Sequence, residues 1–318
     1  MSNPFAGIRW IWMNGSLVEF EKATVHVLSH ALHYGSGVFE GIRCYETPEG
    51  PAVFRLPEHM RRLENSCKIY RMPLRFSARE LADAVCETVQ ANGLGACYIR
   101  PLVYRGFGTL GVNPMRSPVE VAIAVWSWGK YLGAEAEEGV DVCVSSWRRP
   151  APDALPAVAK ATGNYLSSQL IKVEALTNGY VEGIALDESG YVSEGSGENI
   201  FLVQGGALVT SPPSASLLPG ITRDTVMTLA GELGIPVRQE PVSRGQLYVC
   251  DELFMTGTAA EITPVRSVDK IEVGTGRPGE VTRRLMAEFK GVTSGESADR
   301  HGWRFPVVRQ QVAYETRP

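Results

Sequence analysis

The chain has 318 residues, of which 44% are hydrophobic and 21% charged, and its formal net charge is −4. This length is sufficient for two domains, each with a buried core. The weakly acidic charge excludes the basic surface typical of a nucleic-acid-binding protein, and no apolar run approaches the ~20 residues that cross a bilayer. We therefore expect neither nucleic acid nor a membrane as a partner.

The N-terminus and the cysteines indicate the compartment. Residues 1–9 lack a charged stretch followed by an apolar segment, so no secretory signal is expected. The six cysteines are scattered without a C-x-x-C pair, which favours free buried thiols, no metal site and a cytoplasmic protein. They are Cys44, Cys67, Cys86, Cys97, Cys143 and Cys250.

Residues 1–128 are expected to form a smaller N-terminal α/β domain. An Asn14-Gly15 pair predicts a turn between two strands, and Pro57 suits the first position of a helix. Ser77 followed by Glu80 is a capping box that begins a second helix. The expected elements are strands within 10–21 and at 97–105 and 119–127, and helices at 57–71 and 78–91, while residues 24–28 alternate apolar and polar.

A polar, glycine-bounded segment at 129–139 predicts an interdomain linker, and 140–318 is expected to form the larger C-terminal domain. Residues 148–163 resemble a functional loop. Trp303, Phe305 and Tyr314 lie in a tail that either packs or frays. Here the expected helices are 164–178, 222–233 and 278–290, and the expected strands are 140–147, 181–186, 191–193, 199–203, 207–210 and 252–256.

Two short segments could bind an anion. After Pro219-Gly220, Ile221 and Thr222 begin a helix, whose first N–H groups and positive dipole end attract phosphate. The small residues Gly257-Thr258-Ala259-Ala260 follow a strand and would let a ligand meet backbone N–H groups. An ordinary loop-to-helix junction and a plain β-turn remain the alternatives for the two segments.

Lys160 and Glu194 are candidates for cofactor chemistry. Lys160 has small, mostly apolar neighbours, and a desolvated lysine is a nucleophile that can form a Schiff base. Glu194 lies in a glycine-flanked turn between strands, where a rigid carboxylate can hold a pyridine nitrogen protonated and strengthen pyridoxal phosphate (PLP) as an electron sink. A solvent-facing lysine and a solvated hairpin turn are the alternatives.

Tyr98 and Arg100 stand two apart on one expected strand, so their side chains share a face. A phenol and a guanidinium together suit a carboxylate, although a structural ion pair is an equal alternative. His26, His30 and His33 are close in sequence, but no acidic or thiol ligand completes a metal site. We interpret these histidines as packing or hydrogen-bonding residues.

Taken in order, these segments resemble the branched-chain amino acid aminotransferases of the fold-type IV group of PLP enzymes. The resemblance covers about residues 9–295. Each motif alone has low specificity, whereas the ordered set is highly specific. The matching strings are Ser29–Gly35, Phe39–Arg43, Tyr98–Leu102, Gly111–Pro114, Lys160–Tyr165, Tyr191–Asn199, Leu218–Arg223 and Gly257–Pro264.

The resemblance implies an α+β fold of two domains, each with a mixed or barrel-like sheet and flanking helices. It implies that Lys160 carries the cofactor and moves the proton between substrate and cofactor, while Glu194 holds the pyridine nitrogen and Tyr165 the phenolic oxygen. The further implied cofactor contacts are Arg62, Asn199, Leu218, Ile221, Thr222, Gly257 and Thr258. The implied substrate contacts are Tyr34, Phe39, Tyr98, Arg100, Trp128, Tyr131, Thr258, Ala259 and Ala260.

The implied reaction is a ping-pong transfer of the amino group of leucine, isoleucine or valine to 2-oxoglutarate. The family builds its site with groups from a second subunit, so a homodimer or a multiple of it is implied. Arg100 would bind the second carboxylate of glutamate. Arg105, in a segment where the family varies, would add another arginine near the mouth of the pocket.

Three alternatives remain open. A D-amino acid aminotransferase would share Lys160 and Glu194 but would place its carboxylate-binding groups differently. A 4-amino-4-deoxychorismate lyase would eliminate pyruvate without an apolar pocket. A non-catalytic binding protein on the same fold would be expected to have lost Lys160 or Glu194, and the chain retains both.

Overall fold

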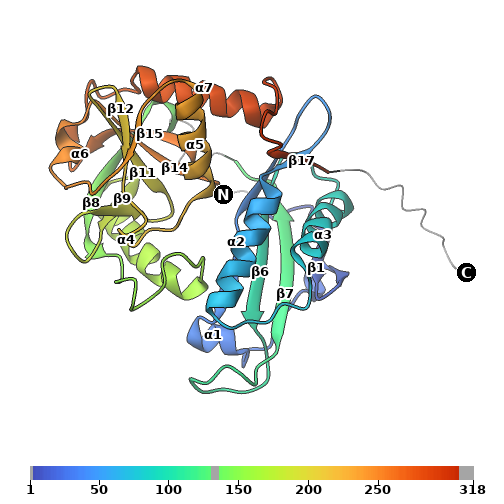
Figure 1. Ribbon diagram of the computed structural model, residues 1–318. Coiled ribbons are helices and arrows are strands. Elements are labelled where there is room, and N and C mark those ends of the chain that lie inside the picture. The colour runs from blue at the N-terminus through green and yellow to red at the C-terminus, as the bar shows by residue number, and fades with distance from the viewer. Residues whose placement is uncertain (1–2, 130–135, 308–318) are drawn as a thin grey trace, which may run out of the picture.

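The computed structural model describes residues 3–129 and 136–307, and within them the chain forms two sheets with helices packed on them (Figure 1). The fold is α+β, as the sequence predicts. None of the described helices is long and apolar enough to cross a membrane.

The first sheet runs in the order β17-β5-β4-β6-β7-β1-β2, and β3 pairs with β6. Helices α2 (Leu56–Ile69) and α3 (Ala78–Ala91) pack against each other and cover one face, where Ile99 and Val103 of β6 meet the helices in a common core. The strands are β1 (Trp10–Met13), β2 (Ser16–Glu19), β3 (Gly37–Phe39), β4 (Ile42–Tyr45), β5 (Ala52–Phe54), β6 (Cys97–Arg105), β7 (Val119–Trp126) and β17 (Arg304–Pro306).

The second sheet runs in the order β10-β9-β8-β15-β14-β11-β12-β13, and β16 pairs with β15. Helix α4 (Tyr165–Thr177) packs on β8 and β9, while α5 (Ile221–Glu232) and α7 (Glu280–Ser294) pack together near β14. The strands are β8 (Val140–Arg148), β9 (Glu182–Leu186), β10 (Val192–Gly195), β11 (Asn199–Gln204), β12 (Ala207–Thr210), β13 (Val237–Gln239), β14 (Glu252–Gly257), β15 (Glu261–Val268) and β16 (Ile271–Glu272).

The last described strand returns to the first sheet. Strand β17 pairs antiparallel with β5, and Trp303 packs beside Phe54 in a core shared with α5 and α7. Of the tail residues, Trp303 is buried and Phe305 partly buried, while Tyr314 lies outside the described residues. Residues 130–135 of the expected linker also lie outside them, and the division into domains stays a prediction.

Most of the expected long elements are present, but several short ones were not foreseen. The sequence did not predict α1 (His30–Tyr34), α6 (Gln246–Val249) or the three-residue helices Phe20–Lys22, Ala136–Glu138 and Thr162–Asn164. It also missed β3, β4, β5, β13, β15, β16 and β17. Residues 24–28, where apolar and polar side chains alternate, form no ladder, and His26 Nδ1 instead accepts from the N–H of Leu28.

Candidate functional site

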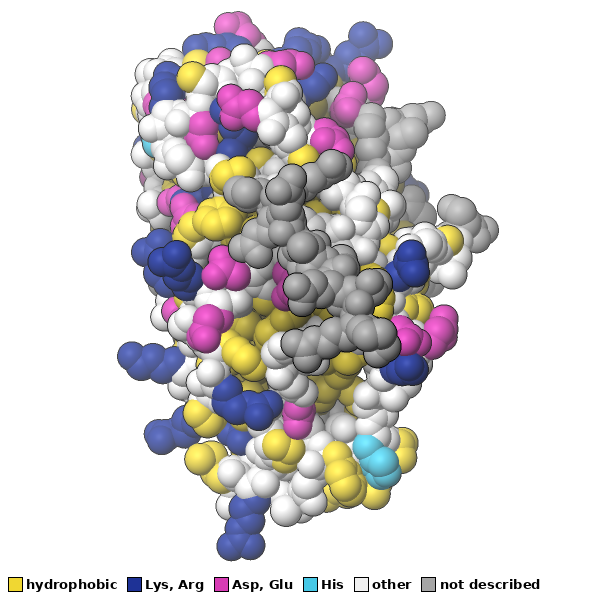
Figure 2. Space-filling view, turned by 90° about the vertical axis from the view of Figure 1, so that its right-hand side faces the viewer, with side chains coloured by type: hydrophobic (Ala, Val, Ile, Leu, Met, Phe, Trp, Pro, Cys, Tyr) yellow, Lys and Arg dark blue, Asp and Glu magenta, His cyan; other side chains and the backbone are white. Residues whose placement is uncertain are grey.

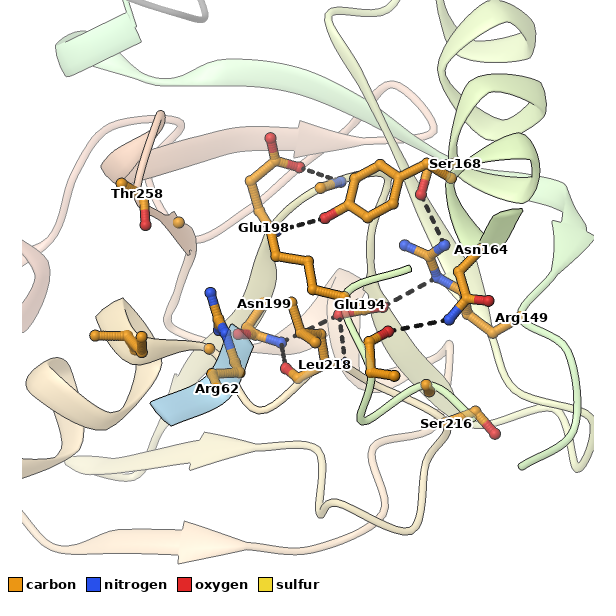
Figure 3. A pocket seen from close by; sticks show the side chains of 18 of the residues that line it. Arg62, Arg149, Asn164, Ser168, Glu194, Glu198, Asn199, Ser216, Leu218 and Thr258 are labelled. Atoms are coloured by element: carbon orange, nitrogen blue, oxygen red, sulfur yellow. Dashed lines mark hydrogen bonds and ion pairs between the residues drawn. The ribbon is translucent and has the colours of Figure 1, made fainter. Parts of the chain in front are cut away.

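Arg62 of α2 and residues of the second sheet and its helices line a cavity that is partly open to solvent (Figure 3). The expected PLP-binding residues all contribute to its wall. They are Arg62, Lys160, Tyr165, Glu194, Asn199, Leu218, Ile221, Thr222, Gly257 and Thr258. Residues far apart in the sequence therefore meet in one place.

Lys160 is held by its backbone as well as by its side chain. Its carbonyl accepts from the N–H of Phe39 at 3.0 Å, and its N–H donates to Ser66 Oγ at 3.1 Å, so β3 and α2 fix the loop. Its Nζ lies 2.6 Å from Tyr165 Oη and 5.1 Å from the centre of the Phe39 ring. The amine is thus placed inside the cavity beside a phenol.

Glu194 on β10 is buried against the same cavity. Its Oε2 accepts from the N–H of Leu218 at 3.1 Å and from Asn199 Nδ2 at 3.3 Å. Its Oε1 lies 3.2 Å from Arg149 Nε, an ionic contact because that N–H is not aligned for a hydrogen bond. Burial raises the pKa of Glu194, and Arg149 opposes the shift.

Arg149 was not foreseen, since the sequence shows only an arginine in a loop. It is buried and donates to Ser168 Oγ and to the carbonyls of Gly195 and Ser196. These bonds place its charge behind Glu194. In Figure 3 the two side chains point toward each other.

The opposite end of the cavity suits an anion. Helix α5 begins at Ile221 directly after Gly220, and a Cβ at Gly220 would lie 2.0 Å from Asn199 Oδ1, so this position requires glycine. Elsewhere in the cavity wall, Asn164 Oδ1 and Thr256 Oγ1 are buried without a partner among the described residues. A helix N-terminus, an arginine and unpaired polar groups fit a phosphorylated, polar cofactor.

The turn after β14 is fastened to the first sheet. Glu261 has a left-handed backbone (φ 54°), and its Oε1 accepts from Arg43 Nη1 at 3.1 Å and from Tyr45 Oη at 2.9 Å. A left-handed glutamate is uncommon and persists only where its surroundings hold it. The two contacts therefore fix the shape of the Thr258-Ala259 turn.

An aromatic cluster lies beside this turn. Arg100 stacks 4.7 Å from the Phe39 ring and 5.4 Å from the Tyr98 ring, and its Nε is buried without a partner among the described residues. Trp128 and Ala259 pack against the same cluster. The sequence-predicted substrate residues Phe39, Tyr98, Arg100, Trp128 and Ala259 are thus brought together.

The other expected substrate residues are placed differently. Tyr34, on α1, is 46% exposed, and its described ring contacts are with His30 and His33. Ala260 follows in the 258–260 turn, and its carbonyl accepts from Thr263. Tyr131 lies outside the described residues.

The expectation that Arg105 stands at the mouth of the pocket was wrong. Arg105 is 3% exposed and donates to the carbonyls of Ser117 and Arg71. Side chains alternate along β6, so Arg105 shares the face of Ile99 and Val103 and not that of Arg100. Its role is to satisfy buried carbonyls.

The expectation for the histidines agrees with their contacts. His30 is buried, and its ring nitrogens lie 2.7 Å from Ser36 Oγ and 2.8 Å from the carbonyl of Gly111. His33 contacts the carbonyl of Val27 at 3.0 Å. Across residues 3–129 and 136–307, no cluster of three His, Cys, Asp or Glu side chains could hold a metal ion.

A second carboxyl group, Glu198, lines the cavity. Burial, and then the charge of Glu182, raise its pKa from 4.5 to about 8, while Lys172 opposes the shift. A carboxyl group with a raised folded-state pKa binds more protons in the folded than in the unfolded state, so stability falls as the pH rises through this window. The cofactor-free protein is therefore expected to lose stability between about pH 4.5 and 8.

Urea unfolding of the cofactor-free protein across this pH range measures the effect. Glu198→Gln, which mimics the protonated group, is expected to flatten the pH dependence. Exposed Glu87→Gln is the matched control and is expected to leave it unchanged. Equal slopes for Glu198→Gln and the parent protein would contradict the expectation.

Comparisons with known proteins place this geometry in a family. A sequence model of the amino-transferase class IV family matches residues 37–268. The branched-chain-amino-acid aminotransferase of Salmonella typhimurium is 56% identical over 300 residues, covering 94% of this chain and 97% of that protein. The relative of the same name from Pseudomonas aeruginosa is 44% identical, covering 92% and 96%.

Solved structures agree. The Escherichia coli branched-chain amino acid aminotransferase has a TM-score of 0.93 and 55% identity, covering 95% of this chain and all of that one. The branched-chain amino acid aminotransferase from Thermobaculum terrenum, in its PLP form, has a TM-score of 0.88 and 36% identity, covering 97% of this chain and all of that one. The chain belongs to the class IV aminotransferases, in the family of the branched-chain-amino-acid aminotransferases. It is a PLP-dependent enzyme.

Proposed function

We propose that the enzyme transfers the amino group of leucine, isoleucine or valine to 2-oxoglutarate, giving branched 2-oxo acids and L-glutamate by a ping-pong reaction. The observation that carries this proposal is that Lys160, Glu194 and the N-terminus of α5 line one and the same cavity. All the cofactor-binding residues that the family resemblance implies line this cavity. The names of the relatives support the substrate class.

Each end of the cavity is matched to one part of the cofactor. Ile221, Thr222, Thr258 and Arg62 would hold the phosphate through N–H groups, hydroxyls and a guanidinium. Glu194 would hold the pyridine nitrogen and Tyr165 the phenolic oxygen. Asn199, Leu218 and Gly257 would complete the wall. When bound, PLP supplies an electron sink that takes up the charge left at the substrate Cα.

Lys160 would act as the acid–base group. Its Nζ lies 2.6 Å from Tyr165 Oη. The amine would remove the proton at the substrate Cα and deliver it to the cofactor. The backbone bonds of Lys160 to Phe39 and Ser66 limit the movement of the loop. The proton would therefore be moved by the Lys160 side chain, without movement of the backbone.

The substrate would bind between the fixed turn and the aromatic cluster. Tyr98 Oη and the N–H groups of Thr258 and Ala259 would receive the α-carboxylate. Phe39, Trp128 and Ala260 would line the apolar side-chain pocket. Arg100, which is surrounded by aromatic rings, would bind the second carboxylate of glutamate or 2-oxoglutarate.

Replacing Arg100 with methionine tests the dual specificity. We expect KM for 2-oxoglutarate to rise on the order of 10-fold or more, because a charge-assisted hydrogen bond is lost. We expect KM for leucine to change little, because methionine keeps the apolar stem. Steady-state kinetics with each substrate varied separately measure the effect. An equal rise in both KM values would contradict the role of Arg100.

A donor comparison tests the activity itself. With 2-oxoglutarate as acceptor, we expect leucine, isoleucine and valine to be used and D-alanine to be a poor donor. Preference for D-alanine would instead indicate a D-amino acid aminotransferase. Release of pyruvate from 4-amino-4-deoxychorismate would indicate a lyase.

We also propose a homodimer, or a multiple of it, with groups shared between subunits. Figure 1 places α1 at the lower end of the molecule, and Figure 2 shows apolar side chains at the lower end of the face that it views. Leu32, Phe107 and Val112 are 61%, 56% and 88% exposed in α1 and the loop after β6. Such exposure favours a protein interface. Sedimentation analysis is expected to give at least a dimer, and a monomer would contradict the proposal.

A cytoplasmic location is proposed as well. All six cysteines are free thiols, five of them buried, as is usual in a reducing compartment. Fractionation of the producing cell, followed by activity assay of each fraction, is expected to recover the enzyme with the cytoplasm. Recovery outside it would overturn the assignment.

A further inference from the structure

Behind Arg62 lies a carboxylate that no part of the proposed reaction uses. Glu40, between β3 and β4, is 0% exposed. Its Oε1 accepts from Arg62 Nε at 2.7 Å, and its Oε2 accepts from Arg62 Nη2 at 2.8 Å and from His59 Nδ1 at 2.7 Å. Arg62 and Glu40 thus form a bidentate ion pair, and His59, one turn earlier on α2, donates a further hydrogen bond to the carboxylate.

The charges in this group follow from burial and pairing. Burial alone would raise the pKa of Glu40, but Arg62 and His59 together bring the pKa well below its usual range. Burial lowers the pKa of His59, although Glu40 opposes the shift. Glu40 is therefore ionised and His59 neutral, with its Nδ1–H donated to the carboxylate. The buried charge is balanced, as stability requires.

The pairing fixes the guanidinium of Arg62. Its Nε and Nη2 edge is occupied by Glu40, and its Nη1 donates to the carbonyl of Pro219 at 3.0 Å. A guanidinium has five N–H donors, so two remain. Because Arg62 lines the cavity next to Gly220 and Ile221, a phosphate there would meet a donor group that is already immobilised.

We propose that Glu40 is a positioning residue for the cofactor phosphate, acting through Arg62, and that His59 holds Glu40 in place. The inference rests on the proposed contact between Arg62 and the phosphate. Arg62 alone is a flexible side chain that would lose conformational freedom on binding. Because Glu40 already holds the Arg62 side chain in place, little conformational entropy is lost when the phosphate binds. The carboxylate also partly neutralises the positive charge of the arginine.

Glu40→Gln tests the inference, because an amide cannot accept from Arg62 and His59 at both of its ends. The measurement is the dissociation constant of the cofactor-free protein for PLP and for pyridoxal, which lacks the phosphate, by fluorescence titration. We expect binding of PLP to weaken about tenfold and binding of pyridoxal to stay unchanged. Equal weakening of both would show a merely structural role and overturn the inference.

Two further variants separate this inference from the proposed role of Arg62. The double variant Glu40→Gln/Arg62→Met buries no lone charge and is expected to lose the preference for the phosphorylated ligand. If the double variant loses the preference for PLP over pyridoxal and Glu40→Gln keeps this preference, the inference fails and the role of Arg62 stands. If the double variant keeps it, the role of Arg62 fails, and the inference with it.

His59 supplies the conservative rescue. His59→Asn keeps an N–H donor near Glu40 and is expected to retain most of the PLP preference, whereas His59→Leu is expected to reduce it. Equal preference in the two His59 variants would contradict the assigned role of His59. Glu87→Gln, which changes an exposed carboxylate on α3, is the matched control and is expected to leave both dissociation constants unchanged.

Discussion

Replacing Lys160 with alanine is expected to abolish transamination and the visible absorbance band that PLP acquires when it is bound to a lysine. The amine is the acid–base group of the proposed reaction, and its Nζ stands inside the cavity beside Tyr165 Oη. Loss of such a group costs on the order of 10⁴-fold in rate. Absorbance spectra of the purified protein and turnover of leucine with 2-oxoglutarate measure both losses.

Lys290→Ala is the matched control, since Lys290 is exposed on α7 away from the cavity. It is expected to keep both the band and the activity. A Lys160→Ala protein that retains the visible band would place the cofactor on another lysine. A colourless parent protein that stays colourless with added PLP would contradict the cofactor assignment altogether.

The second large effect is expected at Glu194. Glu194→Gln keeps an acceptor for the N–H of Leu218 but removes the negative charge that would hold a protonated pyridine nitrogen. We expect kcat to fall on the order of 100-fold or more, as when other preorganised electrostatic groups are removed. Single-turnover rates with leucine, measured at saturating PLP, separate this loss from weaker cofactor binding.

Arg149 complicates this variant, because its charge would then be buried without its partner. Glu194→Asp keeps the charge and is expected to recover part of the rate, which loss of folding alone would not explain. Glu188→Gln, in the exposed turn before β10, serves as the control. Near-normal single-turnover rates in Glu194→Gln would show that the carboxylate does not hold the ring nitrogen.

The residues of the site that could be predicted are those whose local sequence carries a physical signal. Gly220 before Ile221 marks a helix start, and glycines around Glu194 mark a tight turn. Tyr98 and Arg100 share a face because strand side chains alternate. The same alternation, applied to Arg105, places it on the opposite, buried face, so that error was avoidable from the sequence alone.

Other residues carry no such signal. Glu40 and His59 are separated along the chain by two strands and a helix start, and only the fold brings their side chains to Arg62. Arg149 stands in a loop whose course depends on contacts with β10 and α4. Strands β3, β4 and β5 are three or four residues long, too short for periodicity to be decisive.

The return of β17 to β5 has a consequence for biosynthesis. The two strands lie near opposite ends of the chain, and the carbonyl of Trp303 also accepts from the N–H of Arg55 at the start of α2. One edge of the first sheet therefore stays open until residues 304–306 have left the ribosome. Pairings this distant in sequence form slowly. An uncovered strand edge invites association with other chains, so nascent molecules are most vulnerable to aggregation before the last strand emerges.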